Sequence, residues 1–235
     1  MTIQPLRIRH PLPLLTKETR PLDIRPDNVC LLVQDVHSPF TDAKDGWLAR
    51  RARDKVLMRE FEEYFFILNL ISPNIPRILA AVRELSITVV FSSLGHHASD
   101  STSPFQEAMG WDWDLDGCVG TFQEAWLPQK GELVLSKPGW SALGNPSFER
   151  TLSEKGITNV LVIGTMLDFG IRQTCVDLSD RGIGSLIVSD GVVAMTKAGQ
   201  EYTSDSIAHG LIKLRTAGET LGLLDVLQME GSVLI

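Results

Sequence analysis

The 235 residues of this chain are enough for one domain. Apolar residues make up 43% and charged residues 22%, a globular composition that excludes disordered, collagen-like and coiled-coil chains. Lys and Arg together number 22 against 29 Asp and Glu, so the net charge is −7. Because phosphate binding needs a concentrated basic patch, we expect no nucleic-acid partner.

Cysteine usage and the apolar segments bear on where the protein is found. Cys30, Cys118 and Cys175 cannot form a disulfide framework, and no Cys-x-x-Cys pair indicates a zinc site. Residues 1–20 hold prolines and charges without the apolar stretch of a signal peptide. The most apolar stretch, 64–71, is shorter than the ~18 residues of a membrane span. We therefore expect a cytoplasmic protein with no membrane partner.

Along the chain, short apolar runs alternate with helical patterns. Residues 1–26 hold five prolines and predict an extended arm lying on the domain or on a neighbour, and residues 27–235 predict a single domain. Continuous apolarity is typical of strands buried on both faces of a parallel sheet. We predict strands at 29–35, 87–91, 133–135, 160–163 and 186–188, and helices at 73–85, 146–154, 168–181 and 200–215. The alternation predicts a three-layer, Rossmann-like α/β fold with a central, mostly parallel sheet flanked by helices.

Two segments interrupt this alternation. Residues 44–70 insert a charged and then aromatic amphipathic stretch, and residues 94–130 form a long irregular loop. Loops of this length are usually functional lids or oligomer contacts. The apolar residues of 61–71 exceed what one helix face needs, which predicts an interface and a homo-oligomer.

Chemistry in such a sheet is expected outside the carboxyl ends of the strands. Asp35 ends the first predicted strand, Lys137 follows the third, and residues 164–170 follow the fourth. A buried carboxylate facing a lysine can act as an acid–base pair, because each group sets the pKa of the other. Taken alone, Asp35 could instead be a helix cap and Lys137 a surface residue.

Three ordered motifs resemble the isochorismatase-like (cysteine hydrolase) superfamily over about residues 27–228. They are Leu-Leu-Val-Gln-Asp-Val-His at 31–37, Lys-Pro-Gly-Trp-Ser-Ala-Leu at 137–143, and the segment 162–177 from Val-Ile-Gly to Thr-Cys-Val-Asp. The resemblance implies a hydrolase of small amides, ureides or vinyl ethers, with no cofactor, that forms a dimer or tetramer. The usual triad of that family is Asp, Lys and Cys, and Asp35 and Lys137 match two of its members.

The cysteine of the triad does not carry over. The family's cysteine lies twelve residues before the glycine that ends the helix, and counting back from Gly182 gives Gly170. Cys175 would lie about 140° around a helix from position 170, so we interpret it as a core residue. Without a thiolate, covalent acyl transfer loses its nucleophile, and Thr165 and Thr174 are weak substitutes without an adjacent base.

Glycine at this position is similar to true isochorismatases, which protonate a vinyl ether and let water attack. The resemblance then implies Asp35 as general acid, Lys137 as its electrostatic partner and Gly170 as room for substrate. The predicted helix start at 168–172 would offer backbone N–H groups to an anion. Leu94 and Ser103 stand where those enzymes carry a glutamine and an arginine, which argues against isochorismate itself. The candidate substrate-binding residues are Gly170, His37, Leu94, Trp140, Asp168 and Phe169.

Other residues leave alternatives open. His37 lines the pocket or is a core histidine. His96 and His97 lack two ligands of the nicotinamidase pattern Asp-x-His-x-x-x-His, so we expect no metal. Trp111 and Trp113 stack on a ligand or fill a subunit contact.

Three functional hypotheses follow. The first is a small-molecule hydrolase that works without cysteine, through Asp35 and Lys137, on a vinyl ether or a related bond. The second is a non-catalytic descendant that binds a small ligand or a partner. The third is an amide or ureide hydrolase that uses another group, such as His37 or a bound water.

Overall fold

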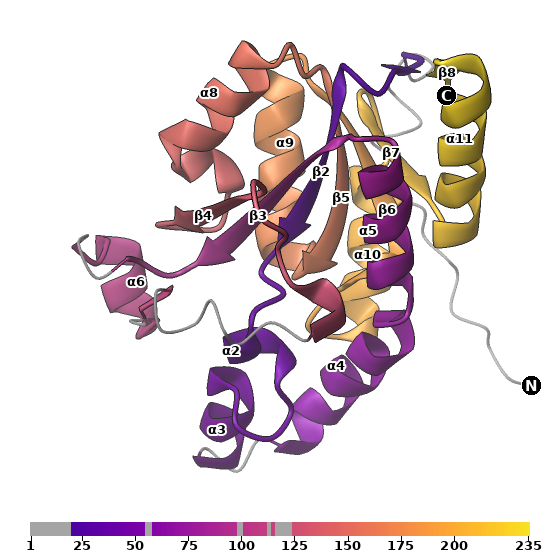
Figure 1. Cartoon of the computed structure of the whole chain (residues 1–235). Coiled ribbons are helices and arrows are strands. Elements are labelled where there is room, and N and C mark those ends of the chain that lie inside the picture. The colour runs from indigo at the N-terminus through magenta and orange to yellow at the C-terminus, as the bar shows by residue number, and fades with distance from the viewer. Residues whose placement is uncertain (1–19, 55–57, 98–100, 112–113, 116–123) are drawn as a thin grey trace, which may run out of the picture.

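The computed structural model describes residues 20–54, 58–97, 101–111, 114–115 and 124–235. Its centre is a six-stranded, entirely parallel sheet in the order β4-β3-β2-β5-β6-β7 (Figure 1). The strands are β2 Val29–Gln34, β3 Thr88–Leu94, β4 Leu133–Lys137, β5 Asn159–Thr165, β6 Gly184–Val193 and β7 Ile212–Arg215. This architecture confirms the predicted three-layer α/β fold.

Helices cover both faces of the sheet (Figure 1). They are α2 Ser38–Thr41, α3 Trp47–Asp54, α4 Met58–Ile71, α5 Asn74–Glu84, α6 Pro104–Met109, α8 Pro146–Glu154, α9 Arg172–Asp180, α10 Lys197–Ile207 and α11 Ala217–Glu230, with short turns of helix at η2 Glu124–Trp126, η3 Ala142–Gly144 and η4 Leu167–Ile171. Helices α4, α5 and α11 lie on one side of the sheet, and α8, α9 and α10 lie on the other.

The continuous apolar run of β2 explains the two cores. Successive side chains of a strand point to opposite faces. Leu31 and Val33 therefore pack with α5 and α11 in one hydrophobic cluster. Cys30 and Leu32 pack with α8, α9 and α10 in the other. Because β2 is central and both its faces are covered, all six of its residues are buried, and a polar one among them needs a buried partner. Gln34 is the one residue of the six with a polar amide.

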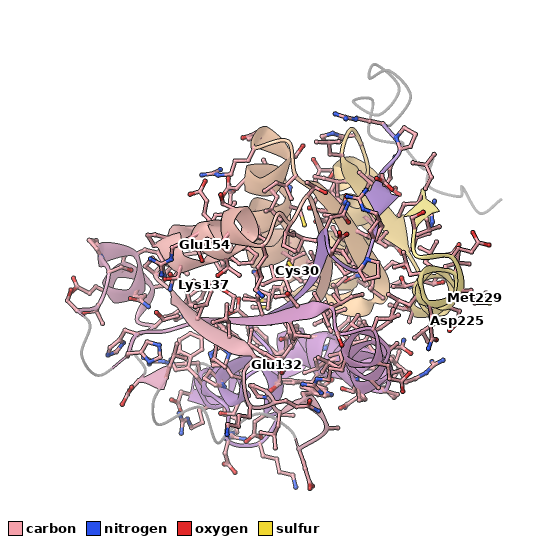
Figure 2. The ribbon with its side chains drawn as sticks, turned by 45° about the horizontal axis from the view of Figure 1, so that its top comes forward. Cys30, Glu132, Lys137, Glu154, Asp225 and Met229 are labelled. Atoms are coloured by element: carbon pink, nitrogen blue, oxygen red, sulfur yellow. The ribbon has the colours of Figure 1, made fainter. Side chains whose placement is uncertain are left out.

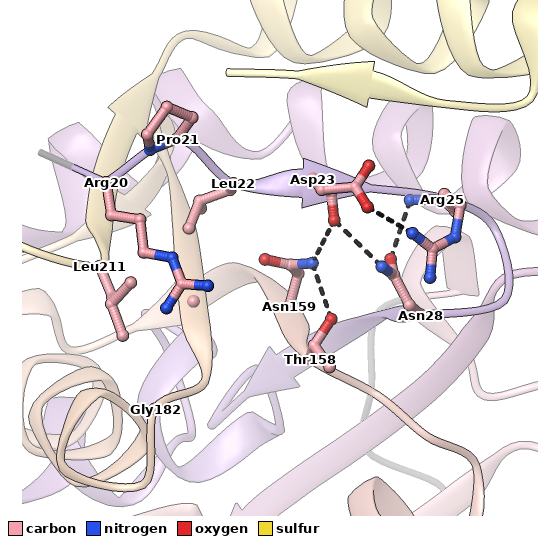
Figure 3. A pocket seen from close by; sticks show the side chains of 11 residues that line it. Arg20, Pro21, Leu22, Asp23, Arg25, Asn28, Thr158, Asn159, Gly182 and Leu211 are labelled. Carbon is pink, nitrogen blue, oxygen red and sulfur yellow. Dashed lines mark hydrogen bonds and ion pairs between the residues drawn. The ribbon is translucent and has the colours of Figure 1, made fainter.

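The segment before β2 lies on the domain. Strand β1, Asp23–Ile24, pairs antiparallel with β8, Val233–Leu234, and the side chains of Leu22 and Ile24 are buried. Beside β1, at the amino ends of β2 and β5, is a cavity of about 340 Å³ into which the Arg20 side chain points (Figure 3). The amides of Asn28 and Asn159 both donate to the Asp23 carbonyl there. This cavity lies at the edge of the sheet opposite to Asp35.

The carboxyl-terminal third differs from the sequence prediction. The helix predicted at 200–215 ends at Ile207, and residues 212–215 are the edge strand β7, paired with β6. Gly210 lies between them with a positive φ of 57°, which breaks the helix. Helix α11 was not predicted, although Thr216 and Glu219 form a capping box at its start. The prediction was wrong because the helical spacing of residues 211–215 also fits a short strand.

One stretch, Phe61–Glu84, is long and apolar enough to cross a membrane by length and composition. The sequence expectation counted uninterrupted apolar residues, whereas this stretch reaches the length through its mean hydropathy and has charged residues within it. The stretch consists of α4 and α5, and α5 buries Ile75, Ile78 and Leu79 against the sheet. Packing of these side chains in the core therefore also accounts for the apolar composition of this stretch.

Candidate active site

An ion pair occupies the carboxyl edge of the central strands. The Lys137 ammonium lies 2.7 Å from Asp35 Oδ2, and the two side chains are 0% and 3% exposed. Asp35 directly follows β2 and Lys137 ends β4, with β3 between them. The parallel order of the strands brings these residues, 102 positions apart in the sequence, into contact, as the sequence-predicted site requires.

Every polar atom of the Asp35 carboxylate has a partner. Oδ1 accepts the Leu94 N–H at 2.6 Å, and Oδ2 accepts from Lys137. The backbone of Asp35 has a φ of +52°, which is uncommon for a residue other than glycine. It is held there by its N–H, which donates to the Ser92 carbonyl, and by its own carbonyl, which accepts from Thr165 Oγ1. Strained backbone of this kind is concentrated at functional sites.

The Lys137 ammonium is equally well satisfied. Besides Asp35, it donates to the carbonyls of Gly139 at 3.2 Å and Trp140 at 2.9 Å. Burial lowers the pKa of Lys137, and the Asp35 charge and hydrogen bond offset part of that decrease. A lysine with a lowered pKa hydrogen-bonded to a carboxylate can pass its proton across a short distance, which is the property an acid–base pair needs.

Gly170 faces this pair, but a side-chain amide fills the space in front of it. A Cβ at position 170 would lie 2.5 Å from Gln34 Nε2, 3.1 Å from the Trp140 carbonyl oxygen and 3.4 Å from Lys137 Nζ. Gln34 is fully buried. Its Oε1 accepts from the Thr174 hydroxyl at 2.9 Å, and that hydroxyl also lies 2.9 Å from the Gly170 carbonyl. The Gln34 amide therefore occupies the place of a side chain at position 170.

The helix predicted to begin at Asp168 starts differently. Residues 167–171 form a π-helical turn, η4, in which the N–H groups of Phe169 and Ile171 both donate to the Met166 carbonyl. The N–H of Arg172 donates to Leu167 and Phe169 carbonyls. The expectation of unpaired N–H groups across 168–172 was thus wrong for these three residues, because a π-turn pairs donors that the first turn of an α-helix leaves open.

Asp168 does not reach the ion pair. Its two carboxylate oxygens each lie 3.2 Å from the Met195 N, and burial raises its pKa. Asp168 thereby ties η4 to the segment between β6 and α10. Phe169, by contrast, is 43% exposed and stacks on Trp140 with ring centroids 4.9 Å apart.

Aromatic rings continue from Trp140 away from the pair. Trp111 packs edge-on against Trp140 at 4.9 Å, and Trp47 packs edge-on against Trp111 at 5.9 Å. Phe105 contacts both Trp111 and Trp140. Trp111 is only 5% exposed. We call the connected rings of Trp47, Phe105, Trp111 and Trp140 the aromatic wall. Trp113 lies outside the described residues.

The family model of the isochorismatase domain matches residues 29–219 of this chain, four-fifths of its length. The chain belongs to the isochorismatase family. Its fold is shared by a cysteine hydrolase from Pseudomonas syringae pv. phaseolicola, with a TM-score of 0.72 and 18% identity over 90% of this chain and 99% of that one. It is shared by an isochorismatase-like hydrolase from Alkaliphilus metalliredigens, with a TM-score of 0.64 and 20% identity over 83% and 97%. A nicotinamidase/pyrazinamidase from Bacillus subtilis matches with a TM-score of 0.61 and 20% identity over 79% and 99%.

This membership confirms the resemblance inferred from the sequence and makes the chain a hydrolase by family. Cys175 is fully buried among apolar residues of α9 and its neighbours, which confirms its interpretation as a core residue. Burial raises the pKa of Cys30 and of Cys175 to about 12 in each case, so neither thiol ionises near neutral pH. Cys118 lies outside the described residues.

Gln34 is the residue of this isochorismatase-family site that sequence reasoning missed. The sequence feature that could have indicated it is a single amide at the end of the otherwise apolar strand Val29–Gln34, directly before Asp35. Buried amides are retained where they find partners. The partner, Thr174, was considered only as a nucleophile, and only the tertiary structure brings it to Gln34.

His37 is a buried residue whose ring contacts the backbone of Leu94, next to the ion pair. It is 0% exposed, its Nε2 lies 3.0 Å from the Leu94 carbonyl, and its ring packs edge-on against Phe40. Leu94 contributes two main-chain groups, because its N–H binds Asp35 and its carbonyl binds His37. Burial, opposed in part by Asp35, lowers the pKa of His37 to about 4.

The lowered pKa of His37 predicts a loss of stability in acid. The folded-state pKa of about 4 lies below the ordinary value of 6.5, so between these pH values the unfolded chain binds a proton that the folded chain does not. The contribution is full above pH 6.5 and is lost as the pH falls toward 4, by about 3 kcal/mol in all. His37→Gln, which keeps an N–H donor for Leu94, is expected to lose this dependence.

The measurement is urea unfolding of both proteins at several pH values between 4 and 7.5. The difference in free energy of unfolding between wild type and His37→Gln isolates His37 from the carboxylates, which titrate in both. A difference that does not change with pH would contradict the assignment of a neutral, buried imidazole.

Proposed function

We propose that this chain is a small-molecule hydrolase of the cytoplasm that works without a cysteine nucleophile, with Asp35 and Lys137 as its acid–base pair. The observation that carries the proposal is the desolvated 2.7 Å contact between Lys137 Nζ and Asp35 Oδ2 at the carboxyl edge of the sheet. Membership of a hydrolase family supports it. A vinyl ether is the substrate bond that best fits a site with an acid and no nucleophile.

The reaction would begin with one proton. Asp35 Oδ2, having received a proton from Lys137, donates it to the terminal carbon of the vinyl ether, and the double-bond electrons form the new C–H bond. The resulting oxocarbenium ion adds water at the carbon that carries the ether oxygen, and the proton that water loses returns to the pair. The hemiketal hydroxyl then gives its proton to the pair, the bond to the ether oxygen breaks, and that oxygen takes a proton back from the pair, so that the products are a carbonyl compound and the leaving alcohol. General acid catalysis of this kind contributes roughly 10²–10⁴-fold in rate.

A second candidate is a ligand-binding protein without catalysis. It is favoured by the Gln34 amide in front of Gly170, and by the fact that Asp35 and Lys137 satisfy each other and nearby backbone groups without a substrate. A third candidate is hydrolysis of an amide or ureide by a bound water. Thr165 does not supply its nucleophile, because its hydroxyl donates to the Asp35 carbonyl.

The test is a hydrolysis screen of small vinyl ethers, amides and ureides with the wild type and Asp35→Asn. We expect the wild type to hydrolyse a vinyl ether and Asp35→Asn to lose at least about 100-fold in kcat/KM, because an amide cannot donate that proton. The control is Asp180→Asn on the exposed side of α9, which should keep wild-type rates. Equal rates for wild type and Asp35→Asn would assign the chemistry to another group. Ligand binding with no turnover would favour the non-catalytic candidate.

We also propose that the chain self-associates through α4. The apolar residues of this helix divide between two surfaces: Tyr64 and Leu68 are buried in the protein's own core, whereas Phe66 and Leu70 are 63% and 62% exposed. Phe66 and Leu70 are four residues apart and therefore neighbours on one helix face. Exposed apolar patches of this kind mark interfaces.

Light scattering at micromolar concentration tests the association. We expect a dimeric or tetrameric mass for the wild type and a monomeric mass for the double variant Phe66→Glu/Leu70→Glu. Met229→Glu, which places the same charge at a 75% exposed position of α11, should keep the wild-type mass. A monomeric wild type would overturn this proposal.

A further inference from the structure

An apolar cavity of about 260 Å³ is lined by Trp47 and Trp111, two of the rings of the aromatic wall. Its floor is formed by Phe40, Leu48, Ala52 and Trp111, which are at most 5% exposed. Its volume exceeds that of the roughly 150 Å³ apolar cavities that take up benzene. The cavity therefore has room for one aromatic ring and a short chain.

The inserted segment 44–70 builds one side of this cavity. Helix α3 contributes Trp47, Leu48 and Ala52, and Phe61 from α4 lies next to them. Met109 at the end of α6 is 42% exposed and lies at the rim. Neither Asp35 nor Lys137 lines the cavity. Trp111, which does line it, packs against Trp140, whose carbonyl accepts from Lys137, and Phe40, which also lines it, packs against His37.

Among the described residues that line this cavity, Arg51 is the one with a charged side chain. Its guanidinium carbon lies 5.8 Å from the centre of the Trp47 ring, so the side chain is held at the cavity's edge by a cation–π contact. Within the described part of the chain, no carboxylate forms an ion pair with Arg51. A cation beside an otherwise apolar cavity suits a ligand with an apolar body and one anionic end.

We propose that this cavity binds a small aromatic carboxylate, with its ring against Trp47, Phe61 and Trp111 and its carboxylate at Arg51. The proposal does not depend on catalysis by Asp35 and Lys137, and it goes beyond that activity. It also gives the inserted helices α3 and α4 a role, since without them the aromatic wall would face solvent on this side.

Binding is tested on the full chain with 4-phenylbutyrate and its uncharged counterpart 4-phenylbutan-1-ol, by calorimetry and by tryptophan fluorescence. We expect saturable one-to-one binding of both, with the carboxylate the tighter ligand. Arg51→Gln should weaken the carboxylate at least about threefold, the size of a partly exposed ion pair, and leave the alcohol unchanged. Arg50→Gln, the neighbouring exposed arginine that does not line the cavity, should change neither.

A second variant tests the cavity itself. Met109→Trp adds bulk at the rim and should weaken both probes at least tenfold. The matched control is Met229→Trp on the outer side of α11, where Figure 2 places Met229 away from this region. Circular dichroism confirms that each variant is folded. Absence of saturable binding of either probe would overturn the proposal. Equal effects of the Arg51 and Arg50 variants, or of the Met109 and Met229 variants, would also overturn it.

Discussion

Replacing Lys137 with methionine is expected to lower the free energy of unfolding by about 3–5 kcal/mol, because it leaves the buried Asp35 carboxylate without its counter-ion. The carbonyls of Gly139 and Trp140 lose their donor in the same variant. Adding Asp35→Asn removes the uncompensated charge. The double variant Asp35→Asn/Lys137→Met should therefore be more stable than Lys137→Met alone, although the two single changes each destabilise.

Urea unfolding of the four proteins in this cycle gives the coupling energy of the pair. Arg83→Met is the comparison, because the Arg83–Glu132 ion pair has similar geometry at 2.7 Å but keeps 19% and 12% of its side chains exposed. Water can replace much of that lost interaction, so the cost should be about 1 kcal/mol. If Lys137→Met cost no more than Arg83→Met, the Asp35–Lys137 pair would not be desolvated as the structure has it.

Introducing a cysteine at position 170 is expected to destabilise the protein and to give a slow thiol. The new Cβ would lie 2.5 Å from Gln34 Nε2 and 3.1 Å from the Trp140 carbonyl, so Gln34 has to move out of a fully buried position. Overpacking of this kind costs about 1–3 kcal/mol. Shortening Gln34 to alanine removes the obstructing amide, and in that background the cysteine should cost little further stability.

The rate of alkylation by iodoacetamide measures how accessible and how ionised the introduced thiol is. In the double variant Gln34→Ala/Gly170→Cys, the thiol would have the Lys137 ammonium close by, which lowers a thiol pKa and speeds the reaction. Cys30 and Cys175 serve as internal references, since burial keeps both thiols protonated, and a Cys118→Ser background removes the third cysteine. Figure 2 shows Cys30 inside the core, between the sheet and the helices. A Gly170→Cys variant that is as stable as wild type and reacts quickly would show that Gln34 does not fill this space.

The comparison of Asp35 with Gln34 shows how far the sequence reaches. Asp35 follows one strand and Lys137 ends another, and parallel strands place their carboxyl ends at one edge, so their placement at the same edge could be predicted from the sequence. Their contact depends on the strand order β4-β3-β2, which only the structure gives. Gln34 is adjacent to Asp35 in the chain, but its role depends on Gly170 in η4 and Thr174 in α9, about 140 residues further along. No local pattern encodes that contact.

Continuous apolar runs determined the parallel sheet, because only strands covered on both faces can bury such residues at every position. Motif order determined the family and the position of Gly170. Only the tertiary structure decided that a π-turn, η4, precedes α9, that residues 212–215 form an edge strand, and that Trp111 lines an apolar cavity. These features arise from packing between segments distant in the sequence. They are stabilised by packing against other elements and by hydrogen bonds to them, and the sequence of a single segment does not contain that information.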